Sequence, residues 1–510
     1  MAFWLTPSEI TELDRNTINA GTPGLVLMER AGLAVARTVK QILPDASGMI
    51  VLYCGSGNNG GDGFVTARIL REMGYNVIVR PSFGPSSRIT DECRVNMESY
   101  VFAGGLISHE PQITARLAVD ALLGVGFTGN LRGGTLDLAV ECSSLGCPVV
   151  AVDIPTGVDG LTGKCDKSAV KADITITFAA PKLGLLIPPG CGMCGSLLLE
   201  DIGIHIPKND KRRVMDMEYA RSILPSRPVD SHKGTYGKVL VLGGSEKMPG
   251  APMMVSMGAL RAGCGLVELC VPLPASTAVA GRIPETICSY FLPGDVTSLP
   301  DPDGYSVAVI GPGMGKSAST EKVVRYIVGN WKIPLVLDAD ALNVIDSTLA
   351  DMIRNYPADV AITPHPGELR RLTGCGDSLN ERFQAAEKTA KALGVSLLLK
   401  GKPSQAFSED GRRIMTAAGN HGLSTGGTGD VLAGIVAGLM AQGCAGMESI
   451  CLSSFIHGMA SELYSRASSP RSLLPDDLVS LIGEVLYLIE HGKKDAFLGG
   501  FPYWTSGIRL

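Results

Sequence analysis

Two separate series of short aliphatic runs, each alternating with helix-like segments, constrain the fold of this chain more than any other feature. Four such runs lie between residues 50 and 153, and a new series starts at residue 238, beyond a charged stretch at residues 208–213. Aliphatic strands that alternate with helices are typical of parallel sheets covered by helices. At 510 residues the chain also exceeds the usual size of a single hydrophobic core. The sequence therefore predicts an α/β protein with two α/β domains.

The charged stretch places the predicted boundary between these domains. We assign residues 1–213 to the first domain and residues 228–495 to the second, with a linker at 214–227. Residues 496–510 show no clear periodicity and form an unassigned tail.

Charge and cysteine content exclude several functional classes. The formal net charge of −5 leaves no basic field for binding nucleic acid. The thirteen cysteines are an odd number, which favours free thiols in a reducing compartment, and we interpret the lone pair Cys191 and Cys194 as loop packing. The longest apolar run, 431–441, is shorter than the roughly 20 residues that cross a bilayer, and the N-terminus shows no signal peptide. We therefore expect a cytoplasmic protein without membrane contact.

A glycine-rich loop at residues 55–63 follows the first aliphatic run and precedes a helical segment. Its Gly-x-Gly-x-x-Gly spacing formally matches a dinucleotide-binding fingerprint. A nicotinamide dehydrogenase should end its next strand in an acid that holds the ribose, but here that strand ends in Arg80, which would at best serve a 2′-phosphate. An NADP-dependent dehydrogenase therefore stays a weak alternative.

Polar residues in and near this loop predict a different ligand. Asn58, Asn59 and Asp62 supply oxygen atoms for a hard cation and hydrogen bonds for a polar ligand, although the asparagines could also only cap the helix. Asp120 and Asp153 end two later strands, and the carboxyl ends of parallel strands meet at one edge of the sheet. We expect these side chains to converge there.

Two further residues belong to the same predicted edge. Asp153 is followed by Ile-Pro-Thr, where the proline fixes a turn that places Asp153 and Thr156 on one rim. Lys182 is either a charge partner for anionic groups of the substrate or an exposed loop lysine, and its position in the sequence does not distinguish these.

The second half carries two glycine-rich loops. The first, at 311–317, is one residue too short for a P-loop, and Pro312 lacks an N–H that a phosphate cradle would use. The second, at 425–430, precedes an apolar helix, so its backbone N–H groups can hold phosphate. Asp430 beside such an anion site suits phosphoryl transfer to an alcohol, with the carboxylate taking the hydroxyl proton.

Three histidines accompany these loops. His365 lies between two prolines after a strand, in a rigid loop suited to substrate contact. We interpret His421 and His457 as structural.

The motifs of both halves resemble known families. The first half resembles the NAD(P)H-hydrate epimerases in Asp14 and in residues 27–32, 57–63, 120–129 and 153–157. The second half resembles the ADP-dependent NAD(P)H-hydrate dehydratases in residues 232–239, 250–252, 261–265, 311–315, 338–343, 364–368, 400–401 and 425–430. The resemblance implies a Rossmann-like three-layer αβα domain followed by a ribokinase-like α/β domain.

This resemblance implies two linked repair reactions. NADH and NADPH that have added water form R and S hydrates, NADHX and NADPHX. The epimerase would interconvert the two forms, and the dehydratase would return the S form to NAD(P)H at the expense of ADP, with magnesium, through a phosphorylated hydrate. A ribokinase-like kinase of a small alcohol, fused to a ligand-binding domain, is the main alternative.

The resemblance also implies the residues of both sites. Asp153 and Asp430 would be catalytic. Asn59, Asp120 and Thr156 would bind potassium. The hydrate would contact Asn58, Asn59, Gly60, Gly61, Asp62, Gly124, Val125, Gly126, Phe127, Thr128, Gly129, Asn130 and Asp153 in the epimerase, and Ala251, Gly313, His365 and Asp430 in the dehydratase. The nucleotide would contact Lys400, Gly401, Lys402, Pro403, Ser404 and Gly429.

The chain departs from the dehydratase pattern in small ways. Leu423 and Ser424 stand where the family usually has Met and Ala, and Ser404 replaces a common Thr but retains its hydroxyl. We also expect a homo-oligomer.

Overall fold

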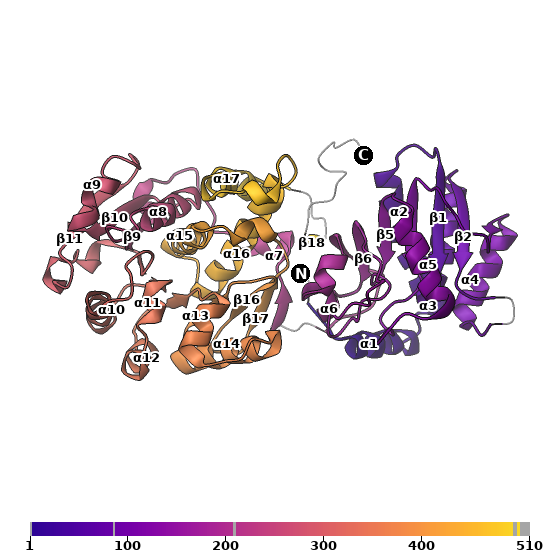
Figure 1. Ribbon diagram of the computed structural model, residues 1–510, viewed down its shortest axis with the longest axis horizontal. Coiled ribbons are helices and arrows are strands. Elements are labelled where there is room, and N and C mark those ends of the chain that lie inside the picture. The colour runs from indigo at the N-terminus through magenta and orange to yellow at the C-terminus, as the bar shows by residue number, and fades with distance from the viewer. Residues whose placement is uncertain (1–2, 85–86, 208–210, 493–496, 500–510) are drawn as a thin grey trace. The chain divides into compact units, whose positions relative to one another are not determined.

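The computed structural model describes residues 3–84, 87–207, 211–492 and 497–499. The chain divides into two compact units near residue 209, each with its own sheet (Figure 1). Both units are helix-covered and mainly parallel, so the predicted α/β fold class is confirmed. No helix within these described residues combines the length and apolar character needed to cross a membrane.

The first unit is built on an eight-stranded sheet, counted over the described residues, in the order β18-β7-β6-β5-β4-β1-β2-β3. Its strands are β1 (Met49–Cys54), β2 (Asn76–Pro81), β3 (Leu106–Ile107), β4 (Leu117–Ala121), β5 (Val149–Val152), β6 (Ile174–Phe178), β7 (Ser196–Glu200) and β18 (Phe497–Gly499). Its helices are α1 (Pro7–Asn19), α2 (Gly24–Ile42), α3 (Asn58–Glu72), α4 (Asp91–Phe102), α5 (Gly133–Ser144) and α6 (Leu183–Leu186). The β7–β18 pair is antiparallel, and the other pairs are parallel.

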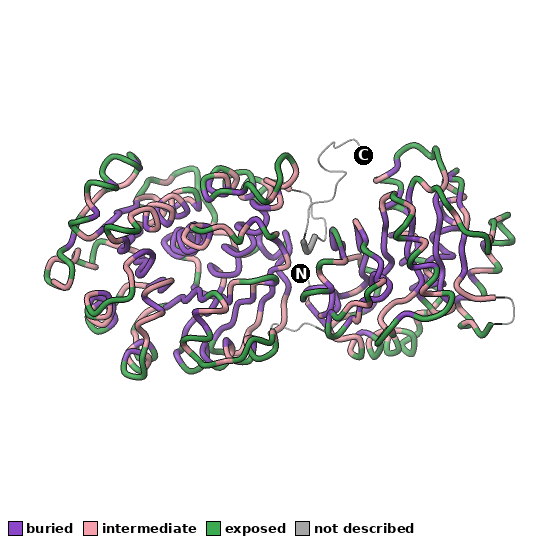
Figure 2. Tube along the Cα trace, in the orientation of Figure 1, coloured by how far each residue is buried: buried purple, intermediate pink, exposed green. Residues whose placement is uncertain are grey.

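Strand β1 lies between β2 and β4, and it is buried beyond its first residue, which explains its aliphatic sequence (Figure 2). Val51 and Tyr53 pack in a cluster with Leu138 of α5. Cys54 faces α3 so closely that a Cβ on Gly63 would lie 2.7 Å from its sulfur. From β1 the chain proceeds to β2 on one side and later to β4 on the other. The crevice outside the carboxyl ends of β1 and β4 is therefore the expected ligand site of this sheet.

The second unit is built on a ten-stranded sheet, again counted over described residues, in the order β11-β10-β9-β12-β13-β14-β15-β16-β17-β8. Its strands are β8 (Arg212–Val214), β9 (Lys238–Leu242), β10 (Leu266–Pro272), β11 (Ile287–Phe291), β12 (Val307–Ile310), β13 (Leu335–Leu337), β14 (Val360–Ile362), β15 (Ser396–Leu399), β16 (Ser404–Phe407) and β17 (Arg413–Thr416). Its helices are α7 (Met217–Ile223), α8 (Gly250–Arg261), α9 (Ser276–Val279), α10 (Ala318–Asn330), α11 (Asp340–Asn343), α12 (Ser347–Arg354), α13 (Pro366–Thr373), α14 (Leu379–Leu393), α15 (Thr428–Ala441), α16 (Gly446–Tyr464) and α17 (Pro475–His491).

Two glycines set the position of α15 in this unit. A Cβ on Gly258 of α8 would lie 2.4 Å from the carbonyl oxygen of Val431, and one on Gly434 of α15 would lie 2.1 Å from that of Val255. The two helices can approach this closely only because both positions lack a side chain. The contact fixes the start of α15, and with it the second glycine-rich loop.

The structure differs from the predicted domain limits at two places. The predicted linker, 214–227, contains the end of β8, which pairs with β17, and helix α7, which packs against α16 and α17. Asp216 begins α7 by accepting a hydrogen bond from the backbone N–H of Tyr219 at 2.6 Å. In the predicted tail, residues 497–499 form β18 beside β7, and the rest lies outside the described residues. Both segments are short, so neither shows a periodicity that sequence reasoning could use.

Candidate active sites

A cavity of about 260 Å³ opens beside the carboxyl ends of β1 and β4 in the first unit. Among its lining residues are Asp14, Asn58, Asn59, Asp62, Gly124, Val125, Asp153 and Lys182. A second cavity of about 550 Å³ shares Asn58, Asn59, Gly124 and Val125 with the first and continues along Gly126, Phe127, Thr128 and Asn130. The structure thus brings most of the predicted hydrate contacts to one crevice.

Two of the three remaining predicted contacts, Gly60 and Gly61, are tightly packed. A Cβ on Gly60 would lie 1.8 Å from the carbonyl oxygen of Gly55, and one on Gly61 would lie 2.4 Å from the sulfur of Met28. Neither glycine, nor Gly129, is among the described lining residues of the two cavities. The first two glycines let the start of α3 pack tightly, and this in turn places Asn58 and Asn59 at the cavity wall.

Asp153 is held by a buried lysine. It follows β5 with a φ of 65°, a left-handed conformation that costs energy in a non-glycine residue and is common at functional sites. Its Oδ1 accepts hydrogen bonds from Lys182 Nζ and, at 3.3 Å, from Thr177 Oγ1. Lys182 is 1% exposed and also donates to the carbonyl oxygen of Phe178 at 3.1 Å. Lys182 is therefore not an exposed loop lysine: it is buried and pairs with Asp153. The predicted contact of Lys182 with anionic substrate groups stays a prediction.

Asp120 and Thr156 form a second polar contact at this edge. Asp120 Oδ1 accepts from Thr156 Oγ1 at 2.6 Å, and Oδ2 accepts from the backbone N–H of Thr156 at 2.7 Å. Burial raises the pKa of Asp120 to about 6, although these hydrogen bonds act in the opposite direction. Nearby, the buried Nδ2 of Asn59 has no hydrogen-bond partner among the described residues. An unbonded buried amide is unfavourable unless a ligand completes the site.

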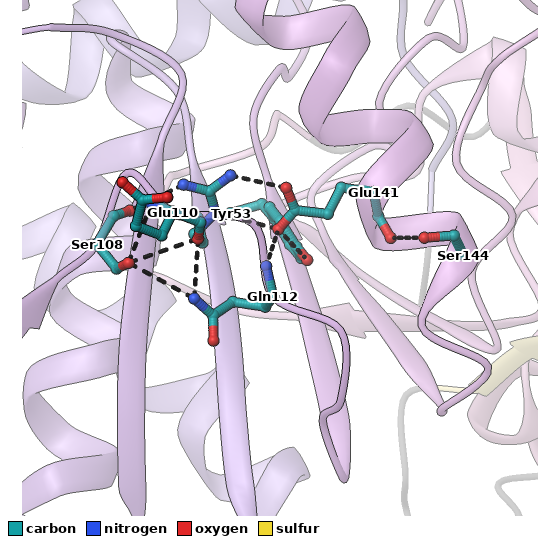
Figure 3. Close-up of polar contacts among 7 residues, drawn as sticks. Tyr53, Ser108, Glu110, Gln112, Glu141 and Ser144 are labelled. Atoms are coloured by element: carbon teal, nitrogen blue, oxygen red, sulfur yellow. Dashed lines mark hydrogen bonds and ion pairs between the residues drawn. The ribbon is translucent and has the colours of Figure 1, made fainter.

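Arg80 is not available to a ribose phosphate. Its Nη2 lies 2.7 Å from Glu141 Oε2, its Nη1 donates to the carbonyl oxygen of Ser108 at 3.1 Å, and its side chain is 5% exposed. The hydroxyl of Tyr53 also donates a hydrogen bond to Glu141 Oε1 at 3.1 Å (Figure 3). Arg80 therefore stabilises the sheet edge and gives no support to an NADP-dependent dehydrogenase.

In the second unit, Asp430 lies in the first turn of α15. The residue before the helix, Gly427, has a φ of 93°, and a Cβ there would lie 2.4 Å from the sulfur of Met254, so glycine suits this position. Burial and the carboxylates of Asp338 and Glu368 raise the pKa of Asp430 to about 7, against the effect of Lys400. Asp430 can therefore accept or release a proton near neutral pH.

Lys400 places a positive charge at the same site. Its Nζ lies 2.7 Å from Asp338 Oδ1, which also accepts from Thr363 Oγ1 at 2.7 Å. Burial opposes the charge of Lys400, but the carboxylates of Asp338 and Glu368 hold its pKa above the usual range. A Cβ on Gly429 would lie 3.4 Å from this Nζ, so the lysine reaches the glycine-rich loop. The predicted nucleotide residues Lys400 and Gly429 are thus neighbours.

Other predicted nucleotide residues form a turn between β15 and β16. The hydroxyl of Ser404 donates to the carbonyl oxygen of Gly401 at 3.0 Å. Lys402 Nζ donates to the carbonyl oxygens of Ala417 and Gly419, so this side chain stabilises the neighbouring backbone.

His365 begins α13. Its Nδ1 accepts from the backbone N–H of Gly367 at 3.0 Å, while Glu368 Oε2 accepts from the N–H of His365 at 2.8 Å. Glu368 is 7% exposed, and burial raises its pKa. Glu368 was not predicted as a site residue, although an acid three residues after a capping residue is a recognisable signal. The predicted contact of His365 with substrate stays a prediction.

The loop at 311–315 packs closely against the residues around it. A Cβ on Gly311 would lie 2.0 Å from the carbonyl oxygen of Asp338, and one on Gly313 would lie 3.0 Å from the Cβ of Ala251. The N–H of Gly315 donates to Asp340 Oδ2 at 2.7 Å. Ala251 and Gly313, both predicted hydrate contacts, are therefore adjacent.

The described residues contain no cluster of three or more histidine, cysteine, aspartate or glutamate side chains suited to a metal ion. All thirteen cysteines are free thiols, as expected. His457 is buried with Nε2 2.9 Å from the carbonyl oxygen of Thr428, and burial lowers its pKa to about 4. A neutral His457 supports the start of α15, in line with its predicted structural role.

Comparisons with known proteins match both units. The family model for NAD(P)H-hydrate dehydratase matches residues 239–483, and the model for the YjeF-related protein N-terminus matches residues 24–184. The bifunctional NAD(P)H-hydrate repair enzyme of Moorella thermoacetica is 34% identical, covering 98% of this chain and 99% of its own length. The enzyme of the same description from Escherichia coli is 33% identical, covering 90% and 89%.

Solved structures also align with part of this chain, and the following is an example. The crystal structure of the ADP/ATP-dependent NAD(P)H-hydrate dehydratase from Bacillus subtilis, co-crystallised with ATP and Mg²⁺, is 29% identical. It covers 55% of this chain and 99% of its own chain, with a TM-score of 0.50.

Proposed function

This chain belongs to the family of bifunctional NAD(P)H-hydrate repair enzymes, and from that premise we propose which of its residues perform the two reactions. One reaction epimerises the R and S forms of hydrated NAD(P)H, and the other dehydrates the S form. The proposal assigns epimerisation to the crevice beside β1 and β4, and dehydration to the start of α15.

In the epimerase site, the hydrate would occupy the two joined cavities. Asn58 lines both of them at the start of α3, where helical N–H groups favour the diphosphate of the hydrate. Asp153 would act as an acid or base near the hydrated carbon, and Lys182 would hold the carboxylate of Asp153 in place.

The residues Asn59, Asp120 and Thr156 fit a potassium ion. The buried amide of Asn59 has no partner among the described residues and can turn its oxygen toward a cation. Thr156 Oγ1 donates to Asp120 and accepts from the N–H of Leu123 at 3.1 Å, which leaves one lone pair free. One carboxylate with two neutral oxygens carries a single negative charge, which suits a monovalent ion.

In the dehydratase site, ADP would place its terminal phosphate between Lys400 and the start of α15. Asp430 would take the proton of the hydrate's hydroxyl as that oxygen accepts the phosphoryl group. Phosphate then leaves as the double bond forms again, because a phosphate ester is a better leaving group than hydroxide. Ala251, Gly313 and His365 would contact the hydrate, and residues 401–404 would contact the nucleotide.

Magnesium also fits this site. Mg²⁺ is usually bound by one or two carboxylates together with water and substrate phosphates, so the lack of a three-ligand cluster among the described residues is no obstacle. Glu368, whose charge acts on Asp430, is the carboxylate that would hold it. Bound there, the ion would neutralise charge on the phosphates.

The observation that carries this assignment is the position of Asp430, with a pKa of about 7, beside both Lys400 and a glycine-rich helix start. The test is to supply ADP or ATP with separated R and S hydrates and follow the absorbance of reduced nicotinamide. We expect recovery of the S hydrate with ADP, and recovery of the R hydrate only through epimerisation. Phosphorylation of a small alcohol without recovery of NAD(P)H would refute the proposal. A homo-oligomeric state and a cytoplasmic location stay predictions.

A further inference from the structure

Epimerisation of the hydrate, on which this inference rests, can proceed by loss and return of water, and that route needs two proton-transfer groups. Water adds to the enamine double bond so that the hydroxyl is on the carbon next to the ring nitrogen. In this route the hydroxyl takes a proton and leaves as water while the nitrogen lone pair forms a C=N bond. A second water then adds to the other face and loses a proton to a base. An acid and a base must therefore reach the ring from different sides.

Two carboxyls in the cavity of the first unit differ in their hydrogen bonding. Asp153 is anchored by Lys182 and Thr177. Asp62 lines the same cavity from α3, and its carboxyl makes no hydrogen bond or ion pair with any described residue. A half-buried carboxyl that lines a cavity and has no protein partner can take one from a ligand there.

We infer that Asp62 is the second catalytic residue of epimerisation, the acid that protonates the departing hydroxyl while Asp153 receives the proton of the incoming water. The two carboxyls come from different elements, the first turns of α3 and the end of β5. After one inversion, Asp62 is ionised and Asp153 is protonated. The same pair then catalyses the reverse inversion, or exchanges protons with solvent, so the charge balances over each cycle.

The electrostatic surroundings agree with this division of roles. Burial, with the carboxylates of Asp153 and Asp14, raises the pKa of Asp62 well above its usual range, and Lys182 acts in the opposite direction. The other titratable groups that face Asp62 are the thiols of Cys54 and Cys93, whose pKa values burial also raises. Glu92 of α4 lies in the same cavity wall. The proton therefore resides on Asp62, while the ammonium of Lys182 lies against Asp153.

The test compares Asp62→Asn with Asp91→Asn in the full chain, without ADP so that dehydration does not proceed. Asp91 is a control for the loss of a carboxylate because it is exposed on α4, pairs with Arg94 and lines neither cavity. Interconversion of purified R and S hydrates is followed by chromatography. We expect Asp62→Asn to lower kcat about 10²–10⁴-fold in both directions, with KM changed less than about threefold, as for loss of a general acid. Asp91→Asn should leave kcat within about threefold of wild type.

The outcomes separate this inference from the proposed function. If wild-type protein fails to interconvert the hydrates, the proposed function fails. If wild-type protein succeeds and Asp62→Asn retains a kcat within tenfold of it, or Asp91→Asn is equally damaging, the assignment of Asp62 is wrong. A measurement that needs no variant is wild-type epimerisation in H₂¹⁸O. Each inverted molecule should gain the heavy oxygen, and retention of the original oxygen would overturn the inference.

Discussion

Replacing Asp430 by Asn should stabilise the second unit even as it abolishes dehydration. The carboxylate of aspartate and the carboxamide of asparagine have nearly the same shape, so the substitution mainly removes a negative charge. In the folded chain the pKa of Asp430 is about 7, against an ordinary value of 3.8. At 1.36 kcal/mol per pKa unit, folding with an ionised Asp430 costs up to about 4 kcal/mol. Partial exposure reduces this, so we expect a gain of about 1–3 kcal/mol at pH 8.

The sign of this effect depends on pH in a defined way. The folded pKa is raised, so the cost is absent below pH 3.8, where the carboxyl is protonated in both states. It grows as pH rises from 3.8 to 7 and is constant above 7. The advantage of Asp430→Asn over wild type should therefore be larger at pH 8 than at pH 5.

Calorimetry of the full chain at both pH values measures this advantage. The relevant transition is the one that ADP shifts upward, since a ligand stabilises the unit that binds it. For a unit of this size, 1 kcal/mol corresponds to roughly 2–4 °C in Tm. Asp340→Asn is the control, because that carboxylate already accepts hydrogen bonds from Gly315 and Asn343 and should give no gain. A Tm of Asp430→Asn at or below that of wild type at pH 8 would refute the reasoning.

Three further predictions concern the same two sites. Asp153→Asn should leave the S hydrate repairable and block use of the R hydrate, which separated isomers with ADP will show; loss of both activities would argue against separate sites. Lys182→Met leaves the buried Asp153 carboxylate unpaired, so we expect unfolding to become easier by about 3–5 kcal/mol in denaturant titration, and an unchanged midpoint would contradict the ion pair. Because Asp430 must be ionised to accept a proton, kcat/KM for dehydration should fall about tenfold per pH unit below 7, and a flat profile from pH 5.5 to 8 would exclude it as the base.

The sequence was sufficient to place the strand-end residues of the first site. Asp120 and Asp153 could be assigned to one edge because a parallel sheet collects the carboxyl ends of its strands there, and the register of β4 with β5 places them so. The sequence also predicted that the loop at 55–63 leads into a helix, and helix α3 begins at Asn58.

Other features depend on contacts that no local pattern encodes. Lys182 looks like an exposed loop lysine until β6 and β5 bring it beside Asp153. The sequence also does not show that the Asp62 carboxyl lacks a partner, because this depends on the side chains of every neighbouring element. Strand β8 was missed because its pairing with β17 comes from residues about 200 positions away.

The two sites share an arrangement of charged side chains. Each places one lysine with little exposure to solvent near more than one carboxyl: Lys182 pairs with Asp153, and Lys400 pairs with Asp338. In each case the lysine satisfies one carboxylate fully, and a second carboxyl is left in a desolvated site with excess negative charge. Such a group holds its proton up to higher pH. Asp62 and Asp430 are these second groups, and both have raised pKa values because of burial and neighbouring carboxylates. A proton that is retained near neutral pH can be given or taken during a reaction, so the same imbalance of charge supports acid catalysis in one unit and base catalysis in the other.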